Sequence, residues 1–533
     1  EARDGASGGG NTARAYQGTV NFYMDGVPGG PEVMDNDAVL DNYKGLPKQY
    51  TFLPGDYGQK AFQVRLRKAG ARTLRTEDRD NPAVFGSRNV TVNPTTADRV
   101  QVIADLDSAG QLPAPGRTED GVEGSTGTPR TKSAGSSVDF LLQVTDKYWN
   151  LVVSSAANVY VMDTDPNNNT ISPDGYVNFT GSTTISRKLV SASASGWGVS
   201  ASGNGLYTNS RNPSSNVPVM PQTADRLLAL FPGEERVQGK FDVQPYGKTG
   251  GLSDLLAGAT FQIGVYGVDE YYNTDTTAGF KVYASIPTDP YDVNPASNTL
   301  VSGATSFIFT PVVAATHTIK AESSSLPTAT SVYYTPDPVR VWWSSPVKLH
   351  LIPPGQSLTP GLSPYDANPS PGGKSGLKSA LTAGSTAQMA VYLVDNYYNV
   401  VKGTTPFMAV SSNTPLIQIN FTNDANIQLR GMHETPYRRS LIAGATNFNV
   451  IPVTRNQSSG LSVQVADTGL AFGTQFSTDT VSGIIVNPAP AKHLLLLVPT
   501  ETAVEGVSGG KTGTAGPLTA GTTYTISVRS VDD

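Results

Sequence analysis

A cassette of turn and strand that occurs four times is the feature that most constrains how this chain can fold. Each copy carries a Gly-x-x-Gly turn, an Ala-Gly pair seven residues after the second glycine of that turn, and an aspartate twelve residues after that alanine. Both spacings are the same in all four copies, so the chain is a tandem repeat. The anchor residues are Gly127, Gly250, Gly376 and Gly513; Ala134, Ala257, Ala383 and Ala520; and Asp146, Asp269, Asp395 and Asp532.

The residues before each aspartate alternate between apolar and polar. In the first copy the apolar positions are Val138, Phe140, Leu142 and Val144. A period of two predicts a strand with one face in a core. The same positions in the other copies are Phe261, Ile263, Val265 and Gly267; Ala387, Met389, Val391 and Leu393; and Tyr524, Ile526, Val528 and Ser530.

Successive aspartates lie 123, 126 and 137 residues apart, which is the size of one β-sandwich. We therefore expect an extended array with boundaries near residues 95, 222, 346 and 489. The predicted parts are an N-terminal segment (1–94) that holds the back half of a repeat, a first repeat (95–221), a second repeat (222–345), a third repeat (346–488) with enlarged loops, and a C-terminal segment (489–533) that holds a front half.

Composition agrees with an all-β fold and excludes several functions. The chain has 54 glycines and 38 prolines, and only 15% of its 533 residues are charged. It has no cysteine, which excludes thiolate metal sites, thiol nucleophiles and disulfides. The net charge of −6 and the absence of a basic stripe argue against nucleic-acid binding. The longest apolar run, residues 494–498, is too short to span a membrane.

The turn after the aspartate gives a family resemblance. It reads Asp146-Lys-Tyr-Trp-Asn150-Leu-Val152 in the first repeat, and Gly18–Phe22 reads Gly-Thr-Val-Asn-Phe. These motifs resemble the bacterial immunoglobulin-like repeats of the invasin and intimin type, found in large surface adhesins and extracellular filaments. The resemblance implies tandem immunoglobulin-like β-sandwiches on a bacterial surface or outside the cell. Its motifs specify a structural module and name no ligand.

Two aromatic residues inside this turn have opposite parity. Tyr148, Tyr271 and Tyr397 continue the inward parity of the strand, so we expect them to close the end of the core. Trp149, Tyr272 and Tyr398 have the outward parity, so we expect them to face solvent or a neighbouring domain. An exposed sugar-binding platform is one alternative, and packing at a domain junction is the other.

One loop has the oxygen ligands of a calcium site. Asp163, Asp165, Asn167, Asn169 and Asp174 occupy positions 1, 3, 5, 7 and 12, the spacing of an EF-hand loop. Position 6 is Asn168 where that loop requires glycine, Pro166 intrudes, and we expect no flanking helices. A plain Asn/Asp-rich turn is the alternative interpretation.

No motif predicts catalysis or a bound cofactor. The Gly-Lys-Thr-Gly turns lack the upstream glycine and the following helix of a phosphate-binding loop. Residues 5–9 and 506–510 match the Gly-x-Ser-x-Gly pattern of a nucleophile elbow, but neither lies between a strand and a helix. The four histidines are scattered along the chain: His317, His350, His433 and His493.

We therefore expect a non-enzymatic structural segment of an extracellular bacterial filament, stalk or matrix. The incomplete halves at the two ends have two explanations. Either the chain is a window of a longer continuous protein, or residues 490–533 of one copy complete a sandwich with residues 1–94 of its neighbour, which gives a head-to-tail polymer. The alternative is an adhesin or carbohydrate-binding array that holds surface glycans.

Overall fold

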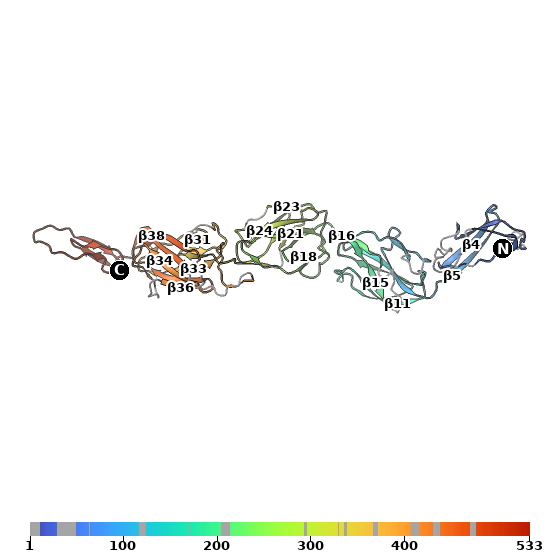
Figure 1. Cartoon of the computed structure of the whole chain (residues 1–533), viewed down its shortest axis with the longest axis horizontal. Helices are drawn as coiled ribbons and strands as arrows, with labels where there is room; N and C mark the ends of the chain where they lie inside the picture. The colour runs from blue at the N-terminus through green and yellow to red at the C-terminus, as the bar shows by residue number, and fades with distance from the viewer. Residues whose placement is uncertain are drawn as a thin grey trace. The chain divides into compact units, whose positions relative to one another are not determined.

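The computed structural model confirms an all-β chain of tandem immunoglobulin-like β-sandwiches (Figure 1). It describes residues 11–28, 49–62, 64, 66–116, 124–168, 170–203, 214–292, 296–328, 330–334, 338–365, 371–403, 405–406, 415–429, 437–468 and 476–532. Within these ranges the one helical element is the 3-10 turn η2 (Pro54–Asp56).

The chain divides into two compact units. One comprises Glu1–Asp225, Arg236–Thr249 and Gly267–Thr277, and the other comprises Arg226–Glu235, Gly250–Tyr266 and Ala278–Asp533. The described strand pairings each join two strands of one predicted part. The four boundaries near residues 95, 222, 346 and 489 stay predictions.

The N-terminal segment forms one sheet of order β2-β1-β4-β5, with β3 also paired to β1. Phe22 and Met24 on the inner face of β1 are buried beneath the loop residues Phe62 and Leu66. This small cluster is the core of the segment. The strands are β1 (Thr19–Met24), β2 (Val27–Pro28), β3 (Gln49–Thr51), β4 (Gly70–Asp78) and β5 (Phe85–Val92).

The first repeat stacks a front sheet, β13-β10-β6, on a back sheet, β12-β11-β15, and adds a third sheet, β14-β16-β9. The cassette strand β10 lies at the centre of the front sheet, and all four of its predicted inner residues are at most 1% exposed. The strands are β6 (Arg99–Ala104), β7 (Gln111–Pro113), β8 (Ser125–Gly127), β9 (Lys132–Ser133), β10 (Ser137–Thr145), β11 (Ala156–Asp163), β12 (Gly175–Thr180), β13 (Ser182–Lys188), β14 (Ser193–Trp197), β15 (Val199–Ser202) and β16 (Val217–Met220).

The second repeat has the same plan. Its cassette strand β21 lies between β17 and β24, and the other sheets are β23-β22-β26-β27 and β20-β28-β25. The strands are β17 (Arg226–Leu230), β18 (Glu234–Arg236), β19 (Lys248–Gly250), β20 (Leu255–Leu256), β21 (Phe261–Val268), β22 (Lys281–Ser285), β23 (Asn298–Thr299), β24 (Ala304–Phe309), β25 (Thr316–His317), β26 (Lys320–Glu322), β27 (Val332–Tyr334) and β28 (Val339–Trp342).

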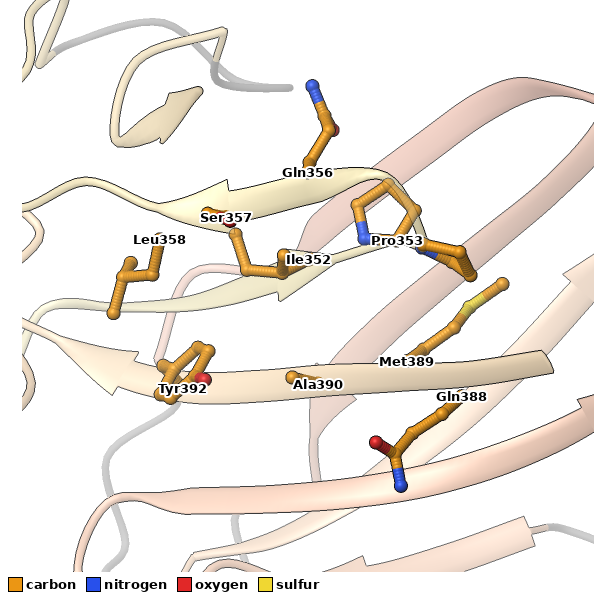
Figure 2. A pocket seen from close by; sticks show the side chains of 10 residues that line it. Ile352, Pro353, Gln356, Ser357, Leu358, Gln388, Met389, Ala390 and Tyr392 are labelled. Atoms are coloured by element: carbon orange, nitrogen blue, oxygen red, sulfur yellow. The ribbon is translucent and has the colours of Figure 1, made fainter. Parts of the chain in front are cut away.

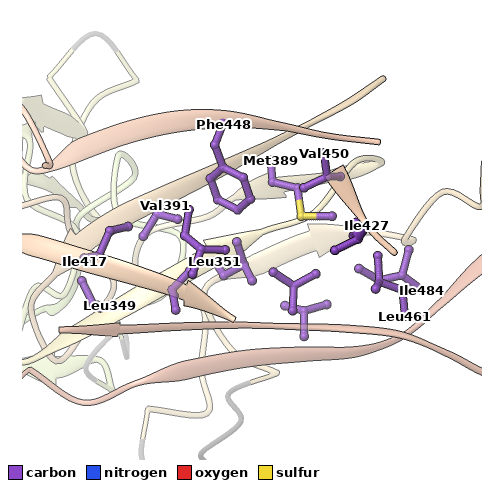
Figure 3. Packing of buried hydrophobic residues seen from close by; sticks show 14 of the residues in the cluster. Leu349, Leu351, Met389, Val391, Ile417, Ile427, Phe448, Val450, Leu461 and Ile484 are labelled. Carbon is purple, nitrogen blue, oxygen red and sulfur yellow. The ribbon is translucent and has the colours of Figure 1, made fainter. Parts of the chain in front are cut away.

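The third repeat shows the sandwich most fully. Its front sheet is β29-β33-β37-β35, and its back sheet is β32-β39-β38-β34-β36. Figure 3 shows Leu351 and Met389 from one sheet packed against Ile417 and Leu461 from the other. The strands are β29 (Lys348–Ile352), β30 (Gln356–Leu358), β31 (Lys374–Gly376), β32 (Leu381–Thr382), β33 (Ala387–Val394), β34 (Leu416–Thr422), β35 (Gln428–Leu429), β36 (Tyr437–Ser440), β37 (Ala445–Ile451), β38 (Asn456–Asp467) and β39 (Asp479–Asn487).

The C-terminal segment contains two strand pairs among its described residues. The fourth cassette strand, β43 (Ser527–Val531), pairs antiparallel with β40 (His493–Leu497), and β41 (Thr502–Ala503) pairs with β42 (Lys511–Thr512). The pairing is Leu496 with Val528, which matches Leu351 with Val391 in the third repeat. Leu351 is fully buried and Leu496 is 50% exposed.

This contrast predicts different costs for the same substitution. Leu351→Ala should destabilise the third repeat by about 2–5 kcal/mol, because it leaves a cavity in a packed core. Leu496→Ala is the matched control, and it should cost less than about 1 kcal/mol, since its side chain is half exposed. Scanning calorimetry of the full chain measures both, and equal shifts of the melting transitions would contradict the assignment of the core.

Candidate functional site

The cassette aspartate forms the same buried hydrogen-bond network in each repeat. Asp269 is fully buried, and one carboxylate oxygen accepts from the backbone N–H groups of Tyr271 and Asn273 at 2.9 and 2.8 Å. The other oxygen accepts from the N–H of Gln222, in the segment that enters the repeat, at 2.9 Å. The carboxylate therefore ties the turn that leaves the cassette strand to the point where the repeat begins.

The contact to the entering segment occurs four times. The donors are the backbone N–H groups of Thr95, Gln222, Ser344 and Ala489, at 2.9, 2.9, 3.0 and 2.8 Å from Asp146, Asp269, Asp395 and Asp532. Burial raises the pKa of Asp269 and of Asp395 above the ordinary value, although the hydrogen bonds to each carboxylate oppose that rise. The geometry thus holds a carboxylate where solvent cannot stabilise it.

The asparagine of the turn bonds the preceding part of the chain. Asn273 donates from Nδ2 to the carbonyl oxygen of Val190 at 2.8 Å, and its Oδ1 accepts from the N–H of Ala192 at 2.7 Å. The same amide bridge joins Asn150 to Arg67 and Ala69, and Asn399 to Val312 and Ala314. A side-chain amide has a donor and an acceptor side by side, so it pairs with a backbone as a strand residue does. We call this two-bond contact the asparagine bridge.

A second buried aspartate shapes the backbone that receives the bridge in the first and second repeats, and the equivalent loop of the third repeat. In the first repeat Asp165 accepts from the N–H groups of Val190 and Ser191 at 2.7 and 2.9 Å. Asp289 does the same for Val312 and Val313, and Asp424 for Val453 and Thr454. The sequence motifs do not identify this second aspartate as a repeated element. Its only sequence signal is Asp-Pro at 165–166 and 289–290, which the third repeat lacks.

A glycine of each following part packs on the same receiving loop. Gly239 has φ +79°, and its backbone lies so close to Ser191 that no Cβ would fit there. A side chain at this position would be strained by both the backbone conformation and the contact. The four glycines are Gly116, Gly239, Gly361 and Gly506, which lie against Lys68, Ser191, Val313 and Thr454.

The structure corrects the predicted directions of the turn aromatics. Trp149 and Tyr398, expected to face solvent or a neighbouring domain, are 1% and 0% exposed and pack against Gly124 and Gly373 of their own repeats. Tyr271 and Tyr397, expected to close their own cores, instead lie against Gly135 and Gly258, the glycines of the preceding Ala-Gly turns. The cause is a left-handed residue at the second aromatic, with φ of 65°, 64° and 64° at Trp149, Tyr272 and Tyr398, which ends the period of two. With Trp149 and Tyr398 buried, the sugar platform first considered is not formed by these two rings.

The calcium loop stays a prediction. The carboxylate of Asp165 accepts hydrogen bonds from the backbone N–H groups of Val190 and Ser191. The side-chain amide of Asn167 donates to the Ser191 hydroxyl at 3.0 Å. Burial raises the pKa of Asp163 to about 6. Asn169 lies outside the described residues. Across the part of the chain that is described, no three His, Asp or Glu side chains gather in a group that could hold a metal ion.

The third repeat also contains a buried cluster of charged residues that the sequence did not predict. Asp479 accepts from Lys374 Nζ at 2.9 Å, and His350 Nδ1 lies 3.4 Å from the same oxygen. Burial lowers the pKa of His350, whereas Asp479 has a lowered pKa because His350 and Lys374 together outweigh its own burial. His350 is 0% and Asp479 is 3% exposed, so no substrate reaches them. The cluster links β29, β31 and β39.

The third repeat also has an open pocket of about 380 Å³, shown in Figure 2. Gln356, Ser357 and Leu358 of β30 line one side, and Gln388 and Tyr392 of β33 line the other. The lining contains no carboxylate, histidine or lysine. The pocket thus offers no paired acid and base for catalysis.

Comparisons with known proteins identify no family for this chain. No model of a known protein family matches the chain, and no curated protein matches it. Solved structures similar to the chain include the Escherichia coli adhesin FdeC, with 13% identity, 75% of this chain and 100% of that chain covered, and a TM-score of 0.26.

Two further neighbours are much longer than the matched region. Escherichia coli alpha-2-macroglobulin activated by porcine elastase has 10% identity and a TM-score of 0.24, with 92% of this chain and 43% of that chain covered. A Bacteroides vulgatus beta-glycosidase has 10% identity and a TM-score of 0.18, with 49% and 24% covered. The described part of the chain contains no helix with the length and apolar composition that a membrane crossing requires.

The asparagine bridge makes a local prediction. Asn273→Ala leaves the N–H of Ala192 without its acceptor, which should lower the free energy of opening at this amide by about 1–3 kcal/mol. Hydrogen exchange of the peptide containing Ala192 measures the change. Asn298→Ala is the control, because Asn298 donates to Ser306 within the second repeat. Unchanged exchange at Ala192 in Asn273→Ala would show that the bridge carries no stability.

Proposed function

We propose that this chain is a segment that carries mechanical force in an extracellular bacterial filament, stalk or matrix. The observation that carries the proposal is the asparagine bridge, present at three successive turns with bonds of 2.7–2.8 Å. Directional hydrogen bonds between consecutive parts restrict bending and twisting more than a flexible linker does. A chain that only displays independent binding domains has no need for such a repeated link.

The distribution of polar groups supports the same function. The buried carboxylates accept from backbone N–H groups inside the protein, and the one pocket described above lacks acid–base residues. These aspartates stabilise the fold, and this structural role accounts for their regular spacing along the chain. In this proposal the repeats are spacers and the junctions set the mechanical properties.

Stretching single molecules of the full chain tests this function. Each repeat that unfolds should release roughly 120–140 residues at about 3.5 Å each, so we expect three steps of about 400–500 Å. Replacing Asn150, Asn273 and Asn399 with alanine together should make the junctions yield at lower force and leave the three steps in place. Gradual extension without steps, or an unchanged response of the triple variant, would contradict the proposal.

One observation favours the adhesin alternative. Tyr176 on β12 is 72% exposed, and its ring stands edge-on to Tyr160 of β11, 5.2 Å between centroids. Exposed aromatic pairs often mark a binding surface. Binding of the chain to a glycan array that disappears with Tyr176→Ala would support this alternative.

A further inference from the structure

The buried charge cluster of the third repeat brings an amine and a carboxyl group into contact away from water. Lys374 Nζ lies 2.9 Å from Asp479 Oδ2, and the two side chains are 6% and 3% exposed. The two residues are 105 positions apart along the chain. Lys374 begins β31 and Asp479 begins β39, so the pairing of these strands with β30 and β38 holds the two groups together.

The two oxygens of Asp479 have different surroundings. Oδ2 accepts from the backbone N–H of Leu351 at 2.8 Å as well as from Lys374. Oδ1 is buried and has no hydrogen-bond partner among the described residues. A buried ion pair that only stabilises a fold normally has donors for both carboxylate oxygens. At Asp479 one oxygen is held in place, whereas the other is free to leave.

His350 lies beside this pair. Its Nδ1 is 3.4 Å from Asp479 Oδ2, and neither ring nitrogen makes a hydrogen bond of good geometry within the described part of the chain. Burial lowers the pKa of this imidazole, so the ring is uncharged at neutral pH and can accept a proton. It packs on the ring of Tyr398, with 4.8 Å between the centroids, and Tyr398 is itself fully buried. The cluster thus contains an amine, a carboxyl group and a group that can move a proton between them.

The other two complete repeats lack part of this arrangement. Lys374 is the second residue of its Gly-x-x-Gly turn, and His350 is the third residue of its opening strand. The counterparts of Lys374 and His350 are Ser125 and Gln101 in the first repeat, and Lys248 and Leu228 in the second. The first and second repeats therefore serve as internal references for the chemistry of the third.

We propose that Lys374 and Asp479 join through an amide bond between Nζ and Cγ, with the release of one water molecule. The ammonium and the carboxylate contain every atom of the products, so the reaction needs no oxidant and no further reactant. Well-oriented groups within one molecule react with effective concentrations of about 10⁵–10⁸ M. Because the released water leaves a buried site, the reverse hydrolysis is disfavoured.

The groups of the cluster account for each step. One proton passes from Nζ to Oδ1, which gives an uncharged amine and an uncharged carboxylic acid. The Nζ lone pair then attacks Cγ, and the N–H of Leu351 stabilises the negative charge that develops on Oδ2. His350 takes a second proton from Nζ and passes it to Oδ1, and the Cγ–Oδ1 bond breaks. Oδ1 leaves as water with both protons, and Oδ2 remains as the amide oxygen.

The first proton transfer is the slow step. Burial favours the uncharged acid, but His350 and Lys374 together hold the pKa of Asp479 below its ordinary value, so the carboxylate is charged at rest. The bond forms only once in each chain, so a slow step is sufficient. Since both reacting groups belong to the chain itself, their burial is no obstacle.

The bond closes residues 374–479 into a covalent loop that contains most of the third repeat. A stretching force can then extend only the residues outside the loop. The chain inside it is roughly 370 Å long at about 3.5 Å per residue, so the unfolding step of the third repeat shortens by that amount from its length without the bond. The reaction itself needs no force and does not rest on the proposed function.

Mass spectrometry of the intact full chain tests the proposal. The expected mass is that of the sequence less one water molecule. Trypsin does not cleave after an acylated lysine, so digestion should leave Lys374 uncut and give one branched peptide that contains Lys374 and Asp479. Lys374→Arg is the matched control, because it keeps the positive charge and removes the nucleophilic amine. The mass of that variant should equal the mass of its own sequence.

His350→Leu tests the proton transfer. Leucine occupies this position in β17 of the second repeat, so the variant is expected to fold. Loss of a general acid–base group slows a reaction by roughly 100-fold or more, so most of these chains should keep the full mass of their sequence. Water loss as complete as in the native chain would overturn the role of His350.

A native chain with the full mass of its sequence would overturn the amide bond. A loss of water that persists in Lys374→Arg would overturn it too, because dehydration elsewhere in the chain would then be its source. The two proposals fail separately. The mass decides whether the bond forms, whereas the steps on stretching and the response of the asparagine variants decide the proposed function.

Discussion

The buried carboxylate at the end of the cassette strand is the interaction on which the rest of the structure depends. A carboxylate away from water is costly unless donors surround it. Asp269 meets that requirement with the N–H groups of its own turn and of the entering segment. These bonds fix the turn, the turn positions Asn273, and Asn273 reaches Val190 and Ala192. One side chain thus sets the connection between consecutive parts.

The sequence predicts the strands because their signal is local. Alternation along each cassette strand identifies the residues that enter the core, and the fixed spacing to the aspartate identifies the repeat. The same alternation fails after the aspartate, where Trp149 and Tyr398 are buried against expectation. A residue in the left-handed conformation inside the turn changes the direction of the side chains around it. Aromatic residues seldom adopt positive φ, so the sequence does not predict this conformation.

The partners of the junction could not be predicted, because they are distant along the chain. Asn273 bonds residues about 80 positions earlier, and Asp165 bonds a loop 25 positions later. Variable loops separate these residues, so no fixed spacing exposes them. The spacing of the oxygen ligands around Asp165 predicts a calcium loop, and this stays a prediction. Only comparison with Asp289 and Asp424 shows that an aspartate at this place orders the backbone that the next repeat contacts.

In the proposed function, asparagine bridges limit the relative motion of consecutive repeats. The distance distribution between two spin labels on either side of one bridge tests it most directly. Labels at Thr184→Cys and Ser306→Cys in the full chain would occupy the first and second repeats. The proposed function predicts one narrow distribution that broadens when Asn273→Ala is added. A distribution of the same width with and without Asn273 would contradict it.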